Sequence, residues 1–146
     1  ILNCVDILKR VGLKFRAENM IGIPGETIDE ALETLDLNIK IKSDVAWCAL
    51  FQPYPKTELG ELCKSMLLWN GSYEKIEKDF FTSCPIKRDR AKEFNNLQKI
   101  FGLVVEYPEL RPFVRALIKM PENGLLRWIS DKFKHYCYNS KLYKVN

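Results

Sequence analysis

Two short segments hold the residues best suited to binding chemistry, and each follows an apolar run typical of a buried strand. Residues 22–27 read Gly-Ile-Pro-Gly-Glu-Thr, and residues 52–57 read Gln-Pro-Tyr-Pro-Lys-Thr. Proline, glycine and short polar residues let backbone groups approach a ligand closely. Because parallel α/β folds bind ligands at the carboxyl ends of their strands, both segments are candidate binding loops. The alternative is that both are simple turns.

Residues 22–27 do not have the composition of a phosphate loop. They contain no lysine, and neither GxxxxGK followed by Ser or Thr nor GxGxxG occurs in the chain. Glu26 stands at the start of the following helix, where an anion would bind, so its carboxylate would compete with phosphate. A nucleoside triphosphate or dinucleotide site is therefore disfavoured, and a cationic or hydroxylated ligand suits the loop better.

The cysteines and the histidine give no metal site of their own. The five cysteines are scattered without CxxC spacing, and they are Cys4, Cys48, Cys63, Cys84 and Cys137. An odd, scattered set argues against a secreted disulfide framework and favours reduced thiols, so we expect a cytoplasmic protein. His135 is the single histidine and has no zinc-type spacing around it.

The elements that must position the two loops follow from apolar periodicity. The expected elements are a helix ending near Arg10 with Gly12 as its cap, a strand within residues 13–23, a helix starting at the Thr27–Glu30 capping box, a strand over residues 44–51 and a helix from Thr57. Helix and strand alternating at this spacing predict βαβ units and a parallel sheet. The class is therefore α/β, with both loops at the carboxyl ends of the parallel strands.

The two halves of the chain differ in charge and aromatic content. Residues 1–68 carry 8 Lys/Arg and 10 Asp/Glu, net −2, whereas residues 69–146 carry 15 and 9, net +6. Four aromatic residues precede residue 69 and 13 follow. The second half shows helical periods over Arg90–Leu103, Leu110–Ile118 and Leu125–Cys137. We therefore expect two regions, residues 1–68 and a helical extension over residues 69–146.

The two loops together resemble segments of the radical S-adenosylmethionine enzymes. Residues 20–27 are similar to their GxPGET segment, and residues 51–57 to the F-x-P-Y-P-G-T segment one strand later. The order of the two segments, the capped helix between them and the stretch Leu8–Leu13 strengthen the resemblance, which covers residues 1–68. Residues 69–146 are similar in character to the helical extension of the cobalamin-associated members, but they carry no diagnostic motif.

The resemblance implies a fold, cofactors and site residues. It implies the C-terminal part of a partial (β/α)6 TIM-like barrel, with residues 13–52 as its last two strands and their helix. In such enzymes a 4Fe–4S iron–sulfur cluster reduces S-adenosylmethionine to a 5′-deoxyadenosyl radical that takes hydrogen from an organic substrate, here unknown. A cobalamin-associated member would add cobalamin. The residues implied at the cofactor are Ile21, Gly22, Ile23, Pro24, Gly25, Glu26, Phe51 and Gln52, the last two largely through their backbone.

Two departures from the family pattern matter. The cluster-binding CxxxCxxC is absent and would lie upstream of Ile1, so we expect this chain alone to bind no cluster and to be inactive. Lys56 stands where the family often has glycine. If that position needs a positive φ, the lysine would be strained, although a different turn or a contact with substrate would also explain it.

The same residues also allow other functions and partners. The alternative is a non-catalytic α/β binding or scaffold module whose helical extension docks a partner, including RNA. The modest, interleaved charge of residues 69–146 disfavours nucleic acid and a membrane surface. No apolar run reaches about 18 residues, so a transmembrane segment is not expected. An open sheet edge predicts self-association unless residues 69–146 cover it.

Overall fold

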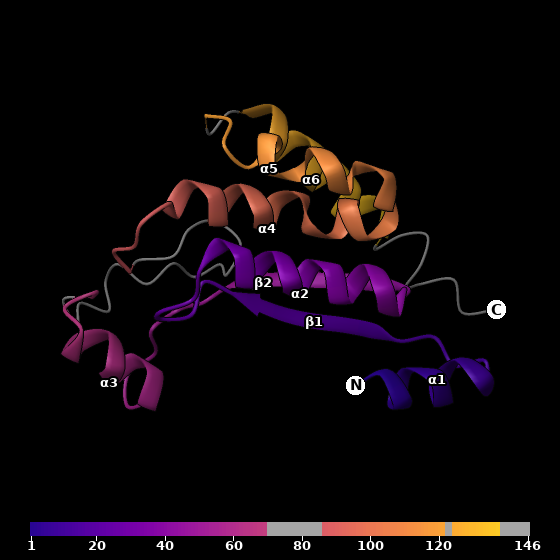
Figure 1. Ribbon diagram of the computed structural model, residues 1–146, viewed down its shortest axis with the longest axis horizontal. Coiled ribbons are helices and arrows are strands. Elements are labelled where there is room, and N and C mark those ends of the chain that lie inside the picture. The colour runs from indigo at the N-terminus through magenta and orange to yellow at the C-terminus, as the bar shows by residue number, and fades with distance from the viewer. Residues whose placement is uncertain (70–85, 122–123, 138–146) are drawn as a thin grey trace.

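The computed structural model describes residues 1–69, 86–121 and 124–137 (Figure 1). The elements in chain order are α1 (Leu2–Arg10), β1 (Arg16–Ile21), α2 (Ile28–Ile41), β2 (Val45–Leu50), α3 (Glu58–Ser65), α4 (Ala91–Glu106), the 3₁₀ helix η2 (Pro108–Phe113), α5 (Val114–Leu117) and α6 (Gly124–Cys137). No helix in these segments is long and apolar enough to cross a membrane.

The described strands form a two-stranded parallel sheet joined by α2. The register pairs Arg16 with Val45 at one end and Ile21 with Leu50 at the other. Parallel strands need a crossover connection, and α2 supplies it, so β1–α2–β2 is one βαβ unit. The predicted α/β class and the parallel pairing of these two strands are confirmed.

The capping box predicted at the start of α2 is present. The Thr27 side chain accepts a hydrogen bond from the Glu30 backbone N–H (3.3 Å), and the Glu30 carboxylate accepts one from the Thr27 N–H (2.7 Å). Two N–H groups that the first helical turn leaves without partners are thereby satisfied. The N-terminus of α2, and with it the end of the loop of residues 22–27, is fixed by this pair.

A pair of asparagines explains why a polar residue, Asn19, lies on the inner face of β1. Asn19 and Asn38 exchange two side-chain hydrogen bonds between the strand and α2, at 3.1 and 2.7 Å. Asn19 also donates to the Trp47 carbonyl (3.0 Å), and Asn38 is almost fully buried. Buried amides are tolerated because each finds its partners, and the pair ties α2 to both strands.

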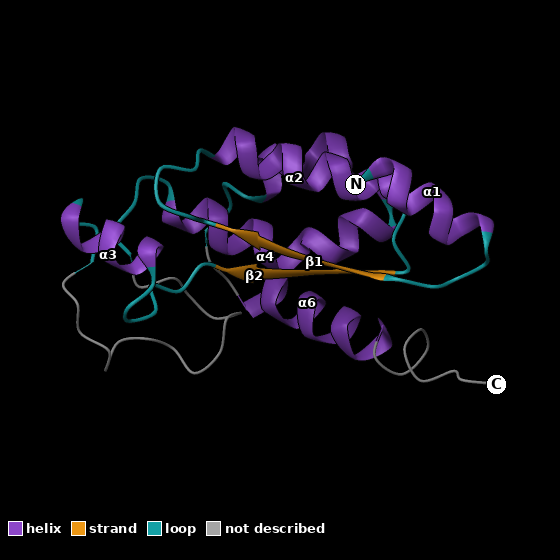
Figure 2. Ribbon diagram, turned by 90° about the horizontal axis from the view of Figure 1, so that it is seen from below, coloured by secondary structure: helices purple, strands orange, loops and turns teal. Residues whose placement is uncertain are grey.

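The core draws on both halves of the chain. Helix α4 packs against β2, α2 and α6, and Figure 2, which views the strands from their open side, shows α4 and α6 behind them. The hydrophobic core includes Ile21, Leu35 and Leu50 from the first half of the chain, together with Leu97, Phe101 and Val104 from α4. The division near residue 69 stays a prediction, and the hydrophobic core runs across it.

The edge of β2 that does not pair with β1 is covered by α4, both by a side chain and by the helix backbone. The Gln98 side-chain amide donates to the Cys48 carbonyl (3.1 Å), and a Cβ on Gly102 would lie only 3.0 Å from the Ala46 carbonyl oxygen. Residues beyond position 69 therefore protect this edge, as a strand edge requires. On the face of β1 away from α2, Arg16, Glu18 and Met20 are exposed.

The helix expected across Leu110–Ile118 is broken. The segment forms η2 and then the single turn α5, and Pro112 lies inside η2. Proline removes a backbone donor and clashes with the preceding turn, so a continuous α-helix is not possible there. Gly124 begins the separate helix α6.

Candidate functional site

The two candidate loops lie side by side at the carboxyl end of the sheet. Phe51, the first residue after β2, donates its N–H to the carbonyl of Ile21, the last residue of β1 (2.9 Å). This bond continues the strand pairing into both loops. The Ile21, Phe51 and Gln52 side chains are buried, whereas Ile23 is 39% exposed at the loop tip. Any contact of Ile21 or Phe51 with a ligand at this edge would therefore be through the backbone.

The carboxylate of Glu26 turns back into its own loop. It accepts a hydrogen bond from the Gly22 N–H and a second from the Ile23 N–H at 3.2 Å. Gly22 and Gly25 both have positive φ, near +84° and +83°, which glycine adopts without strain. The loop thus supplies its own anion to N–H groups that a phosphate would otherwise use. This geometry agrees with the prediction that phosphate ligands are disfavoured.

Burial shapes the acidity of this carboxyl group. Loss of water contact raises the pKa of Glu26 above its ordinary value of 4.5, and Glu30 adds to the increase. The hydrogen bonds from Gly22 and Ile23 and the nearby Arg88 guanidinium lower the same pKa, but less than burial raises it. Glu26 therefore holds its proton more tightly than an exposed glutamate.

Arg88 closes the loop from the opposite side, and the sequence analysis did not identify it. Its guanidinium donates to the Gly22 carbonyl and to the Ile23 carbonyl (3.4 Å), and it lies over the Phe94 ring at 4.4 Å. A Cβ on Gly22 would stand 2.8 Å from Arg88 Nη1, so any larger residue there would displace the guanidinium. Nothing in the local sequence around Arg88 signals this contact, because its partners lie 65 and 66 positions earlier.

A cavity of about 430 Å³ adjoins the loop. Its walls are residues 23–29, residues 86–90, Phe94, and Met66 and Leu68 after α3. The volume is in the range that takes a small organic molecule. Charged residues of both signs and apolar residues line it together, so it suits a ligand with both polar and apolar parts. The charged ones are Glu26, Lys87, Arg88, Arg90 and the aspartates at positions 29 and 89. Gln52 and Phe51 do not line this cavity.

The second loop is built around an unusual lysine. Lys56 has a φ of +60°, the left-handed conformation that glycine favours. Thr57 then caps α3 by accepting from the Gly60 N–H (3.1 Å), while its hydroxyl donates to the Tyr54 carbonyl (2.8 Å). The condition stated for Lys56 from the sequence is therefore met: the position has a positive φ.

The described residues include no group of three or more His, Cys, Asp or Glu side chains placed to hold a metal ion. Cys48 and Cys63 are buried, Cys4 is exposed, and burial raises the pKa of the Cys48 thiol far above its ordinary value. The buried Cys48 thiol therefore stays protonated, whereas metal ligands and nucleophiles are thiolates. Cys84 lies outside the described residues.

Comparison with known proteins gives a partial similarity. No family model matches the chain. Over 58 residues, 40% of its length, the chain is 36% identical to the [FeFe] hydrogenase maturase subunit HydE of Thermotoga maritima. The aligned part spans 17% of the length of HydE.

Proposed function

We propose that this chain is the C-terminal part of a radical S-adenosylmethionine enzyme. The observation that carries the proposal is that the two family-like loops lie side by side at the carboxyl end of a parallel sheet. The hydrogen bond from Phe51 to Ile21 joins the two loops at their start. The 36% identity to HydE, a radical S-adenosylmethionine maturase, supports the same family over part of the chain. Activity, substrate and cofactors of the whole protein are part of the proposal.

The packing of the sheet supports a partial barrel. In a (β/α)6 barrel the helices lie outside and alternate strand residues point inward. Here α2 and α4 pack on one face, while Arg16, Glu18 and Met20 occupy the other and are exposed. The Arg16–Glu18 ion pair on that face is better suited to a polar interior than to an apolar core. Helix α1 would then lead into β1 from a preceding strand.

The loop of residues 22–27 fits the adenosine end of S-adenosylmethionine better than a phosphate. Its exposed Ile23 offers an apolar surface for a flat base, and the space next to Gly25 is open. Glu26 and Arg88 hold the loop backbone in place, so the loop is formed before a ligand binds. When bound with a reduced cluster, S-adenosylmethionine supplies a radical that abstracts hydrogen; this chain's residues would only bind and orient it.

The cluster itself does not fit this chain. A CxxxCxxC segment is absent from the 146 residues, and no described side chains form a ligand group. The cluster would therefore be held by another part of the protein. Membership of the cobalamin-associated kind rests only on the helical character of residues 69–146, and a cytoplasmic location rests only on the cysteine pattern.

The experiment is S-adenosylmethionine cleavage by the whole protein encoded by this reading frame, reconstituted with iron and sulfide without oxygen. We expect 5′-deoxyadenosine to form, and we expect Gly25→Ala to reduce it. Gly12→Ala is the matched control, because Gly12 also has a positive φ (+71°) with open space around it but lies before β1. Clusters that assemble without any deoxyadenosine would overturn the proposal and favour the non-catalytic binding module.

A further inference from the structure

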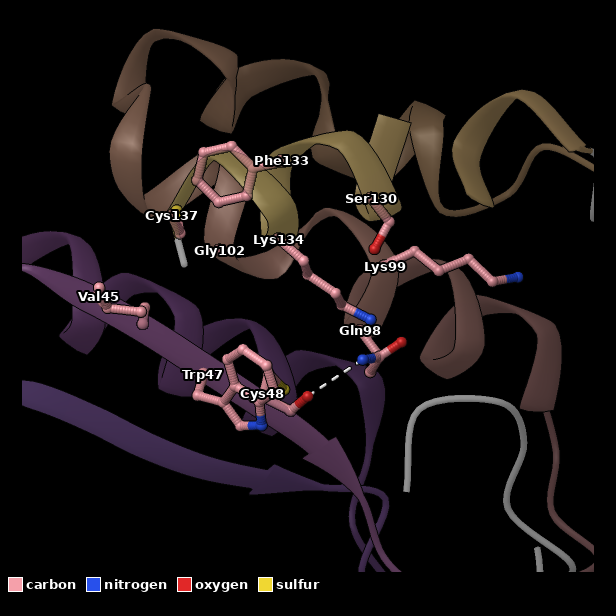
Figure 3. Close-up of a pocket in the computed structure, with 11 residues that line it drawn as sticks. Val45, Trp47, Cys48, Gln98, Lys99, Gly102, Ser130, Phe133, Lys134 and Cys137 are labelled. Carbon is pink, nitrogen blue, oxygen red and sulfur yellow. Dashed lines mark hydrogen bonds between the residues drawn. The ribbon is translucent and has the colours of Figure 1, made fainter. Parts of the chain in front are cut away.

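A second cavity lies on the other flank of β2, between this strand, α4 and α6 (Figure 3). It shares no lining residue with the cavity beside residues 22–27, so it is a separate feature of the fold. Its volume is about 30 Å³. One water molecule needs roughly 10–15 Å³ of such space, so the cavity holds about two waters and is too small for most organic ligands.

Two buried polar atoms of residues that line this cavity have no hydrogen-bond partner within the part of the chain that the structure describes. They are Gln98 Oε1 on α4 and the Ser130 hydroxyl on α6, and both residues are 3% exposed. The amide orientation of Gln98 is fixed, because its NH₂ group donates to the Cys48 carbonyl (3.1 Å) and the reversed amide would set two acceptors against each other. Buried polar groups are normally satisfied, so these two indicate a polar occupant.

The donors and acceptors of the walls define the chemistry of that occupant. Gln98 Oε1 only accepts, so it needs a donor, whereas the Ser130 hydroxyl both donates and accepts. Lys99 and Lys134 also line the cavity, but each already takes part in an interaction of its own, so the walls do not require an ion. A small neutral molecule that both donates and accepts matches these walls, and water is the one that fits the volume.

We propose that this cavity is a structural water site, in which about two ordered waters join α6 to α4 and β2. One water donates to Gln98 Oε1, and the water beside it bonds to the Ser130 hydroxyl. Through the Gln98 amide, this chain of hydrogen bonds continues to the Cys48 carbonyl of β2. Water-mediated hydrogen bonds are nearly as favourable in enthalpy as direct ones. Helix α6 is therefore attached to the sheet by a hydrated contact as well as by apolar packing.

The first test is a crystal structure of the whole protein at a resolution that orders buried waters. We expect separate density peaks within hydrogen-bond distance of Gln98 Oε1 and of the Ser130 hydroxyl. A dry cavity would overturn the proposal, and so would a Ser130 hydroxyl that donates to a carbonyl of its own helix. Density for a single larger molecule would overturn it as well, because the site would then belong to that ligand.

Variants locate the waters in solution, where oxygen-17 relaxation dispersion of the solvent counts long-lived waters. Ser130→Ala removes one partner and should lower the count by about one or two relative to wild type. Ser65→Ala is the matched control and should keep the wild-type count, because Ser65 is exposed on α3 and does not line the cavity. Equal counts for wild type and Ser130→Ala, or an equal drop in both variants, would mean that the site assignment is wrong. Because the crystal structure uses unmodified protein, a misfolded variant would not remove the test.

Discussion

Arg88 donates hydrogen bonds to the carbonyl of Gly22, the residue whose N–H is bound by the Glu26 carboxylate. The peptide groups around Gly22 are therefore held from two sides by opposite charges. Glu26 belongs to the loop, but Arg88 comes from the region beyond residue 69. The second half of the chain consequently takes part in building the candidate site and does not merely cover it.

Replacing Arg88 should loosen the loop. Arg88→Met keeps an apolar chain against Phe94 but removes the donors to Gly22 and Ile23, so we expect a loss of about 1–3 kcal/mol in the free energy of unfolding. Proteolysis within residues 22–27 should become faster as well. Arg127→Met is the control, since Arg127 is exposed and its loss changes the charge alone. Equal denaturant midpoints for wild type and Arg88→Met would show that the contact contributes nothing.

The pH dependence of stability should carry the signature of Glu26. Its folded pKa lies above the ordinary value of 4.5, so the folded state binds this proton more tightly than the unfolded state. Stability from Glu26 is therefore greatest below pH 4.5 and falls as pH rises through its folded pKa. Glu30 and Glu93, whose pKa values are lowered, act in the opposite direction.

The contribution of Glu26 must therefore be measured as a difference in unfolding free energy between wild type and a variant. The unfolding free energy of wild type minus that of Glu26→Gln should decline as pH rises above 4.5, because the glutamine has no proton to lose. A carbon-13 NMR titration of the Glu26 carboxyl gives the pKa directly. A titration midpoint at or below 4.5 would show that the loop hydrogen bonds outweigh burial.

The sequence predicts local elements well because their signals are local. Thr27 and Glu30 form the predicted capping box, Gly12 follows the end of α1 with a positive φ, and β1 and β2 lie inside the predicted ranges. Each of these depends on residues within one or two helical turns. The prediction of one helix across Leu110–Ile118 was wrong, because apolar spacing carries no information about the backbone donor that Pro112 lacks.

Only part of the candidate site could be predicted, because the rest depends on contacts between residues that are far apart in the sequence. The adjacency of the two loops follows from parallel pairing, which the helix–strand order implies. The contact of Arg88 with Gly22, and of Gln98 with the Cys48 carbonyl, spans 66 and 50 residues. No spacing rule reaches across such separations, since they depend on how α4 packs on the sheet.

Lys56 offers a direct test of backbone strain in the second loop. Lys56→Gly should stabilise the fold by about 0.5–1 kcal/mol, because glycine adopts a φ near +60° without a Cβ clash. Lys56→Ala should give no such gain, since alanine keeps the Cβ while losing the same charge. Thermal unfolding of the three proteins measures both effects. A gain for alanine equal to that for glycine would assign the effect to charge rather than to conformation.

The Asn19–Asn38 pair should behave as a single coupled unit. Asn38→Leu removes one partner and leaves the Asn19 amide with fewer buried hydrogen bonds, so we expect a loss of about 2–3 kcal/mol. Asn19→Val should be costly for the same reason. The double variant should be less destabilised than the sum of the two, because no buried amide then lacks its partner. Urea unfolding of all four proteins gives the coupling free energy, and strictly additive losses would mean that the two amides act independently.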